Sequence, residues 1–246
     1  MIAAADPAPA PLALGRRALA EGLGAAGLAA VVIGSGVMAT RLTDDVGVQL
    51  LMNAIATVFG LFVLIAALSG LSGAHLNPAV TLVMLALRRI GRVDAAVYIP
   101  AQVAGCLAGA ALANLMFGLP AVALSTTDRA EPATLLAEVI ATAGLIAVIL
   151  LLIRQEKDAL IAPAVAAYIG AAYFFTSSTS FANPAITIGR VASDTFAGIA
   201  PASAGPFIVA QVVGAAIALG FAVTLAPRAA GPRTATPAPP AETARA

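Results

Sequence analysis

Charge is scarce in this sequence: only 10% of its 246 residues are Asp, Glu, Lys or Arg, whereas a soluble domain carries roughly a quarter. Tryptophan is absent, and the single cysteine, Cys106, excludes an internal disulfide and is expected to pack as a small apolar side chain. The formal net charge of +1, with no basic run interleaved with aromatics, argues against a nucleic-acid partner. Apolar residues make up 61% instead, which predicts long segments that never meet water.

Six apolar runs are long enough for a helix that crosses the hydrocarbon core of a bilayer, which needs roughly 20 residues. They are residues 18–40, 46–68, 95–118, 134–153, 159–177 and 203–226. Two further apolar stretches, 76–87 and 183–191, are too short to span. Short hydrophobic pieces at corresponding places of two halves indicate re-entrant half-helices around a central site. We therefore expect an all-α membrane protein with six transmembrane helices and two re-entrant half-helices.

The two ends of the chain differ from this membrane domain, which we assign to residues 18–226. Residues 1–15 lack a basic segment ahead of an apolar core, and the basic pair Arg16 and Arg17 follows them instead. We therefore expect residues 1–17 to form a disordered leader and not a cleaved signal. Residues 227–246 are rich in Pro, Ala and Thr and are expected to form a disordered tail.

The membrane domain contains an internal repeat. Three pairs of identical or nearly identical blocks follow in the same order: 19–21 and 136–138, 77–81 and 183–187, and 101–105 and 210–214. Repeat one covers 18–118 and repeat two covers 134–226. Because each repeat holds three spans, the second is expected to insert upside down relative to the first.

Basic residues predict the orientation. In a six-span topology one side collects Arg16, Arg17, Arg88, Arg89, Arg92, Arg154, Lys157 and Arg228. Cytoplasmic loops carry an excess of Lys and Arg, so this side, with both termini, is expected in the cytoplasm.

The tripeptide Asn-Pro-Ala occurs as Asn77-Pro78-Ala79 and again as Asn183-Pro184-Ala185. Asn is a favoured N-cap, and Pro suits the first helical turn, where its missing N–H would have no partner. Two half-helices that meet at the membrane midplane would each bring about half a positive charge there, which repels cations and protons. The Asn amides could donate hydrogen bonds to a passing solute. The alternative is that both tripeptides are only helix caps in buried loops.

With these two motifs, and Ser72-Gly73-Ala74-His75 before the first, the chain resembles the aquaporin, or major intrinsic protein, family over residues 18–226. The resemblance implies a passive channel for small uncharged solutes, with no enzyme chemistry, no catalytic residue, no cofactor and no metal site. It also implies a homotetramer with one pore per subunit, embedded in the lipid bilayer of a bacterial inner (plasma) membrane.

Carboxyl groups inside apolar spans are energetically expensive and suggest a function. Glu21 and Glu138 are such groups, and the resemblance implies that each accepts hydrogen bonds from the re-entrant loop of its half. A proton relay is the alternative. Gln102 and Gln211, which also match in the repeat, and His75 are expected to support the loops in the same way.

The resemblance also points to a selectivity filter. Water-selective members narrow at an aromatic on the second span, a residue on the fifth, and an Arg directly after the second Asn-Pro-Ala, where this chain has Ile186. Counting from the motifs places the remaining positions at Thr57, Ala171 and Ser180. With no cation and no ring among these four, a wide constriction is expected. The combination looks like the bacterial branch linked to arsenic resistance, whose members pass metalloid acids such as arsenite.

Arg190 follows Ile186 by four residues, on the same helix face and about 6 Å farther out. It is expected either to act as a cation at the outer mouth or to pair with Asp194. The aromatic residues Tyr168, Tyr173, Phe174 and Phe175 are expected to pack or to lie at the membrane interface, not to line the pore.

Three other functions remain open at this stage. A water-selective aquaporin would differ from a channel for larger uncharged solutes only in its selectivity filter. A secondary transporter would need ligands for a coupling ion, and the spans contain almost no ionisable groups besides Glu21 and Glu138. A structural junction with a closed pore is the third.

Overall fold

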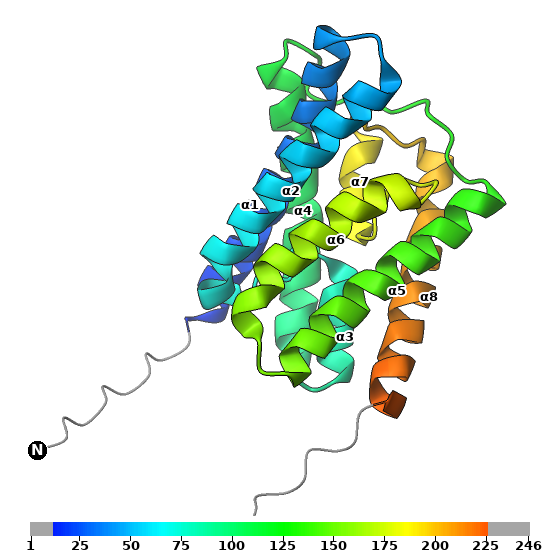
Figure 1. Cartoon of the computed structure of the whole chain (residues 1–246). Coiled ribbons are helices and arrows are strands. Elements are labelled where there is room, and N and C mark those ends of the chain that lie inside the picture. Colours follow the sequence, from blue (N-terminus) through cyan, green and yellow to red (C-terminus); the bar gives the residue numbers. More distant parts are fainter. Residues whose placement is uncertain (1–11, 226–246) are drawn as a thin grey trace, which may run out of the picture.

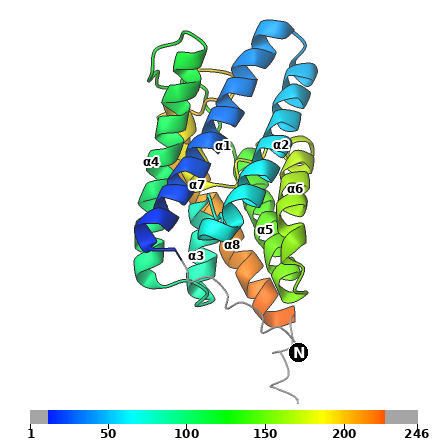
Figure 2. The ribbon, with the colours of Figure 1, turned by 90° about the vertical axis from the view of Figure 1, so that its left-hand side faces the viewer.

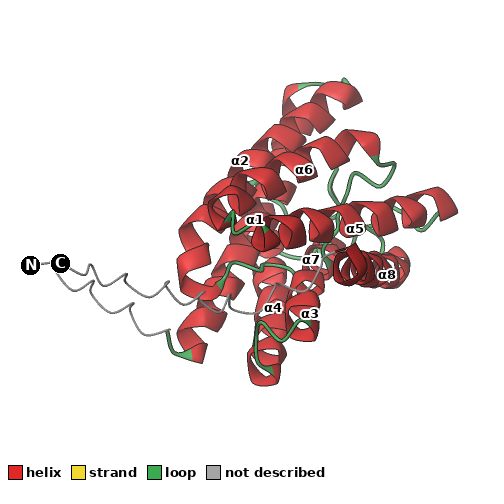
Figure 3. Ribbon diagram, turned by 60° about the horizontal axis from the view of Figure 1, so that its bottom comes forward, coloured by secondary structure: helices red, strands yellow, loops and turns green. Residues whose placement is uncertain are grey.

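The computed structural model describes residues 12–225, which form helices and connecting loops without a strand (Figure 3). The elements are α1 (Leu14–Leu42), α2 (Val46–Ser72), α3 (Pro78–Ala86), α4 (Arg92–Met116), α5 (Pro132–Arg154), η1 (Asp158–Leu160), α6 (Ile161–Phe175), α7 (Pro184–Val191) and α8 (Pro201–Leu225). Six of the helices, α6 counted together with η1, are long and apolar enough to cross a membrane. The predicted fold class is confirmed.

The six long helices surround the two short ones, α3 and α7, which lie one above the other at the centre (Figures 1 and 2). We call the upper end in Figure 1 the loop end; it carries residues 43–45, 117–131 and 192–200. The opposite tail end carries the start of α1, the end of α8 and residues 87–91 and 155–160. The described basic residues that the sequence placed on one side all lie at or next to this tail end.

Glycines allow the helix pairs of each repeat to touch at the backbone. In the pair α1 and α4, a Cβ atom on Gly105 would overlap the carbonyl oxygen of Gly22, and one on Gly109 would overlap that of Ala26. In the corresponding pair α5 and α8, a Cβ on Gly214 would overlap the carbonyl oxygen of Val139. Small residues at such crossings let membrane helices approach closely. In both repeats, therefore, glycine allows the first and third long helices to pack at close distance.

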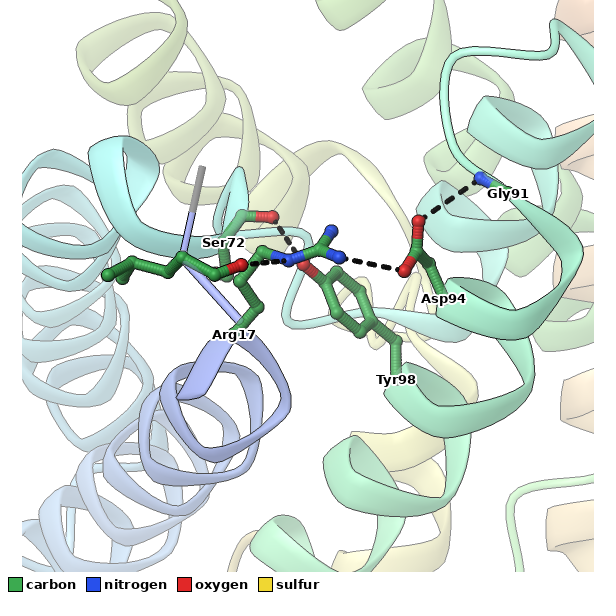
Figure 4. Close-up of polar contacts among 6 residues, drawn as sticks. Arg17, Ser72, Gly91, Asp94 and Tyr98 are labelled. Atoms are coloured by element: carbon green, nitrogen blue, oxygen red, sulfur yellow. Dashed lines mark hydrogen bonds and ion pairs between the residues drawn. The ribbon is translucent and has the colours of Figure 1, made fainter. Parts of the chain in front are cut away.

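The expected leader is too long by four residues, because Leu14 to Arg17 form the first turn of α1. Arg17 anchors this turn: its Nη2 donates to Asp94 Oδ1 of α4 at 2.9 Å and its Nε donates to the Leu12 carbonyl at 3.0 Å (Figure 4). Beside it, the Tyr98 hydroxyl donates to the carbonyl of Ser72, the last residue of α2. The rest of the expected leader, 1–11, and the expected tail, 227–246, lie outside the described residues.

Candidate functional site

Both half-helices begin at an Asn-Pro-Ala tripeptide. Asn77 Oδ1 accepts the Ala79 N–H at 2.8 Å at the start of α3, and Asn183 Oδ1 accepts the Ala185 N–H at 2.9 Å at the start of α7. Pro78 and Pro184 are the first helical residues. Each Asn therefore caps the helix that follows it, as the N-cap preference predicts.

The two Asn amides also tie the loops to each other. Asn77 Nδ2 donates to the Ala182 carbonyl, and Asn183 Nδ2 donates to the Leu76 carbonyl, both at 2.8 Å. The bonds are reciprocal, since each runs to the residue that precedes the other asparagine. An amide NH2 group has two N–H donors, so each side chain keeps a second one for another acceptor.

The loops that precede the half-helices have unusual backbone. Ala74 and Leu76 in the first loop, and Ser180 and Ala182 in the second, have φ between 46° and 52°. Left-handed backbone costs an L-residue roughly 1–2 kcal/mol. Other contacts must hold these segments in place.

Glu21 supplies those contacts in the first repeat. Its Oε1 accepts from the Ser72 hydroxyl at 2.6 Å and the His75 N–H at 2.9 Å, and its Oε2 accepts from the Leu76 N–H at 2.7 Å and Gln102 Nε2 at 2.8 Å. The carboxylate is fully buried. It satisfies four donors, two of them loop backbone N–H groups.

Glu138 occupies the matching place in the second repeat. It accepts the Phe181 N–H at 2.8 Å, the Ala182 N–H at 2.9 Å and Gln211 Nε2 at 2.7 Å, and it is also fully buried. The geometry suits a hydrogen-bond acceptor that fixes the loop.

The sequence reasoning missed two threonines in this network. Gln102 Nε2 donates to Thr81 Oγ1 at 3.0 Å, and Gln211 Nε2 donates to Thr187 Oγ1 at 2.9 Å. The Thr81 hydroxyl also lies 3.1 Å from His75 Nδ1. Thr81 and Thr187 close the repeated blocks 77–81 and 183–187, so their match was the available signal.

A cavity of about 850 Å³ runs beside both half-helices. It extends from Asp158 at the tail end, past His75, Asn77 and Asn183, to Arg190 near the loop end. Most of its wall is apolar, contributed by α1, α2, α5, α6 and the faces of α3 and α7. The Asn side chains are among the few polar groups at its middle.

Near the loop end, three of the four predicted filter positions line the cavity, namely Thr57, Ser180 and Ile186, and Ala171 does not. Ala171 is exposed on the outside of α6, so its assignment was wrong. Two residues further on, about 200° around the helix, Tyr173 faces the cavity instead. Its hydroxyl lies 3.0 Å from Thr57 Oγ1. The prediction that Tyr173 only packs was therefore also wrong, whereas Phe174 and Phe175 are exposed on the outer surface.

Arg190 lines the same part of the cavity and is 4% exposed. Its Nε donates to the Ala197 carbonyl, and its guanidinium carbon lies 3.3 Å from the centroid of the Phe181 ring. The alternative pairing with Asp194 is wrong, because the described residues contain no ion pair between Arg190 and Asp194. Asp194 Oδ1 instead accepts from the N–H and hydroxyl of Thr126 at 3.0 and 3.2 Å. This part of the cavity thus contains a cation, in line with one of the two predictions for Arg190, and aromatic rings, which the four predicted filter positions lack.

Six membrane-length helices around two half-helices, with an elongated cavity beside both helix N-termini, define a membrane channel. The chain belongs to the major intrinsic protein family, whose sequence model matches residues 11–181. Members of this family are channels and not enzymes, and this protein is therefore a channel.

Individual relatives agree with the family assignment. Aquaglyceroporin AqpS of Rhizobium meliloti strain 1021 is 49% identical over 208 residues, covering 85% of this chain and 89% of that protein. Probable aquaporin PIP2-8 of Oryza sativa subsp. japonica is 37% identical over 46% of this chain and 44% of its own length. The crystal structure of the aquaglyceroporin from Plasmodium falciparum has the same fold, with a TM-score of 0.64 and 22% identity over 85% of this chain and 95% of that one.

Proposed function

We propose that the protein is a passive transmembrane channel for small uncharged solutes, namely water, glycerol-like polyols and metalloid acids such as arsenite. The observation that carries this proposal is the cavity of about 850 Å³ that runs from Asp158 past both Asn-Pro-Ala motifs to Arg190. Similarity to a protein named as an aquaglyceroporin over most of both chains supports the polyol part.

Fixed positive charge along the cavity disfavours cations relative to neutral solutes. Each half-helix brings about half a positive charge to its N-terminus, at Asn77 and Asn183. Arg190 adds a guanidinium farther toward the loop end. A cation would cross both regions without a carboxylate to bind it, because among the described lining residues the acidic one is Asp158 at the tail end. A secondary transporter would need such carboxylates as ligands for its coupling ion.

The constriction has a polar and an apolar wall. The Thr57 and Tyr173 hydroxyls and the Arg190 guanidinium supply polar groups, and Ser180 Oγ is buried without a hydrogen-bond partner in the described residues. Ile186 supplies an apolar side chain. A compact solute with several hydroxyl groups, such as glycerol or arsenous acid, fits this arrangement. The ring of Tyr173 and the guanidinium of Arg190 also narrow the passage, which favours a water-selective channel as the second candidate.

Flux through the purified full chain in proteoliposomes tests the proposal. We expect water, glycerol and arsenous acid to enter with a low activation energy. If water enters and glycerol and arsenous acid are excluded, the protein is a water-selective channel. If none of the three solutes enters, it is a structural junction with a closed pore.

Ile186→Arg is expected to reduce glycerol and arsenous acid permeability about tenfold while part of the water flux remains. The added guanidinium would occupy the constriction one helical turn from Arg190, and about 1.4 kcal/mol of extra barrier corresponds to a factor of ten. Ile186→Leu keeps the side-chain volume and is the matched control. Unchanged glycerol flux in a well-folded Ile186→Arg protein would show that residue 186 does not set the passage width.

We further infer that the tail end faces the cytoplasm of a bacterial inner membrane and that the channel assembles as a homotetramer. The basic residues at the tail end support the orientation through the positive-inside rule, and the family resemblance supports the assembly. Cysteine accessibility at residues 44 and 156 in intact cells would test the orientation, and the mass of the detergent-solubilised protein would test the assembly.

A further inference from the structure

Two arginines share one aromatic ring beside the constriction. The guanidinium carbon of Arg190 lies 3.3 Å from the centroid of the Phe181 ring, and that of Arg129 lies 5.5 Å from the same centroid. Phe181 is 5% exposed, belongs to the second re-entrant loop and donates its N–H to Glu138. Arg129 comes from a different place, the loop 117–131 that connects the two repeats.

The same two arginines hold three consecutive carbonyl groups of the segment after α7. Arg190 Nε donates to the Ala197 carbonyl, while Arg129 Nε donates to Gly198 at 2.7 Å and its Nη2 to Phe196 at 3.1 Å. Arg129 therefore fixes the backbone on both sides of the carbonyl that orients Arg190. Arg190 lines the cavity and Arg129 does not.

The backbone around Arg129 is anchored without its side chain. The Arg129 N–H donates to Ser203 Oγ at 2.9 Å, and the Ala200 N–H donates to the Thr127 carbonyl at 2.7 Å. The Ser203 hydroxyl also donates to Asp128, and this hydrogen bond lowers the pKa of that carboxyl group, which keeps the acceptor charged. We expect the loop to stay in place when the Arg129 side chain is shortened.

We propose that Arg129 is a positioning residue that holds the Arg190 guanidinium at the constriction, through Phe181 and the carbonyl groups of residues 196–198. The loop between the repeats thereby becomes a determinant of solute selectivity. This inference rests on the proposed function. Arg129 affects the width and the charge of the passage through Arg190, and it does not touch the solute itself.

The expected mechanism is a loss of order at Arg190. Without the Arg129 guanidinium, the carbonyl groups of Phe196 and Gly198 lose their donors, and the segment that carries the Ala197 carbonyl relaxes. Arg190 then follows its acceptor away from the passage. The like charge of Arg129, whose guanidinium carbon also lies over the Phe181 ring, is lost at the same time.

Arg129→Gln in the full chain tests this in proteoliposomes. We expect the ratio of glycerol to water permeability to rise about threefold, a barrier difference of about 0.7 kcal/mol. Arg129→Lys keeps the charge and is expected to restore part of the original ratio. Arg41→Gln is the matched control. Arg41 also donates to a carbonyl, that of Phe117, and its guanidinium carbon lies 5.0 Å from the centroid of the Phe117 ring, but Phe117, unlike Phe181, does not line the cavity.

The Arg190→Gln variant distinguishes a positioning role of Arg129 from a general effect of Arg129 on loop stability. In Arg190→Gln protein, the additional change Arg129→Gln is expected to leave the permeability ratio unchanged, since the residue that it positions is absent. Phe181→Leu, which leaves the carbonyl contacts of Arg129 available, is expected to raise the ratio in the same direction and serves if Arg129→Gln does not fold.

Three results would overturn the inference. These are an unchanged ratio in Arg129→Gln and Phe181→Leu, an equal effect of Arg129→Gln in the Arg190→Gln background, or an equal effect of Arg41→Gln. Each of these results counts against the inference when the wild-type protein conducts both water and glycerol. A wild-type protein that excludes glycerol contradicts the proposed function instead, so the two failures are distinguishable.

Discussion

Glu138→Leu is expected to abolish solute flux, whereas Glu138→Gln is expected to retain a measurable part of it. The Glu138 carboxylate is fully buried and accepts the N–H groups of Phe181 and Ala182 together with Gln211 Nε2. Leu leaves these donors without a partner in a dry interior, at about 1–3 kcal/mol for each. Gln keeps one acceptor oxygen. The loop whose left-handed residues depend on these bonds would collapse into the cavity in the Leu protein.

The corresponding pair Glu21→Leu and Glu21→Gln should give the same order, because Glu21 accepts from two loop N–H groups in the first repeat. Asp44→Leu and Asp44→Asn are the matched controls, since Asp44 is exposed in the turn between α1 and α2. Water flux at equal protein density in the liposomes is the measurement. Equal losses in the Gln and Leu proteins at Glu21 and Glu138 would favour the proton relay over hydrogen-bond support.

Gly105→Val is expected to prevent the chain from folding into its native helix bundle. The first atom of the new side chain already overlaps the carbonyl oxygen of Gly22, so α1 and α4 must separate along their whole contact. Overpacking in ordinary cores costs about 1–3 kcal/mol, and a clash with backbone, which cannot rotate away as a side chain can, is expected to exceed that range. Because this helix pair also carries Glu21 and Gln102, separation would release the first re-entrant loop as well.

The yield of monodisperse protein in detergent and its melting temperature measure the effect. Gly220→Val is the matched control, because a Cβ atom at that position of α8 meets open space. Gly214→Val should fail in the same way as Gly105→Val, since Gly214 lies against the Val139 carbonyl in the second repeat. A normal yield and melting temperature for Gly105→Val would mean that α1 and α4 are farther apart than in this structure.

The sequence predicted those parts of the fold that depend on length and on repetition. Apolar runs gave the six spans, since a helix must cover the whole hydrocarbon thickness, and the two tripeptides gave the starts of α3 and α7. The repeat singled out Glu21 with Glu138 as loop supports, and the structure places each carboxylate on the N–H groups of its own loop. The repeat was a sufficient signal there, because each carboxylate, its loop and its glutamine recur in the same order in both halves.

The constriction could not be predicted in the same way. Counting from a motif locates a residue along the helix axis, but each residue turns the side chain by about 100°, so a shift from Ala171 to Tyr173 changes the face. The pairing of Arg190 with Asp194 failed for another reason. Side chains at i and i+4 meet only within a helix, and α7 ends at Val191, before Asp194. Arg129 carries no local signal at all, since its contacts lie about 70 residues away.

The reciprocal bonds of Asn77 and Asn183 bear on how such a chain could have arisen. Each asparagine donates to the residue before the other one, which is the pattern that two identical subunits make across a two-fold axis. A single ancestral repeat could therefore satisfy its asparagine only against a second copy inserted in the opposite orientation. A fusion of two such copies would make that contact intramolecular, so that completion of the pore would not depend on the concentration of a partner in the membrane.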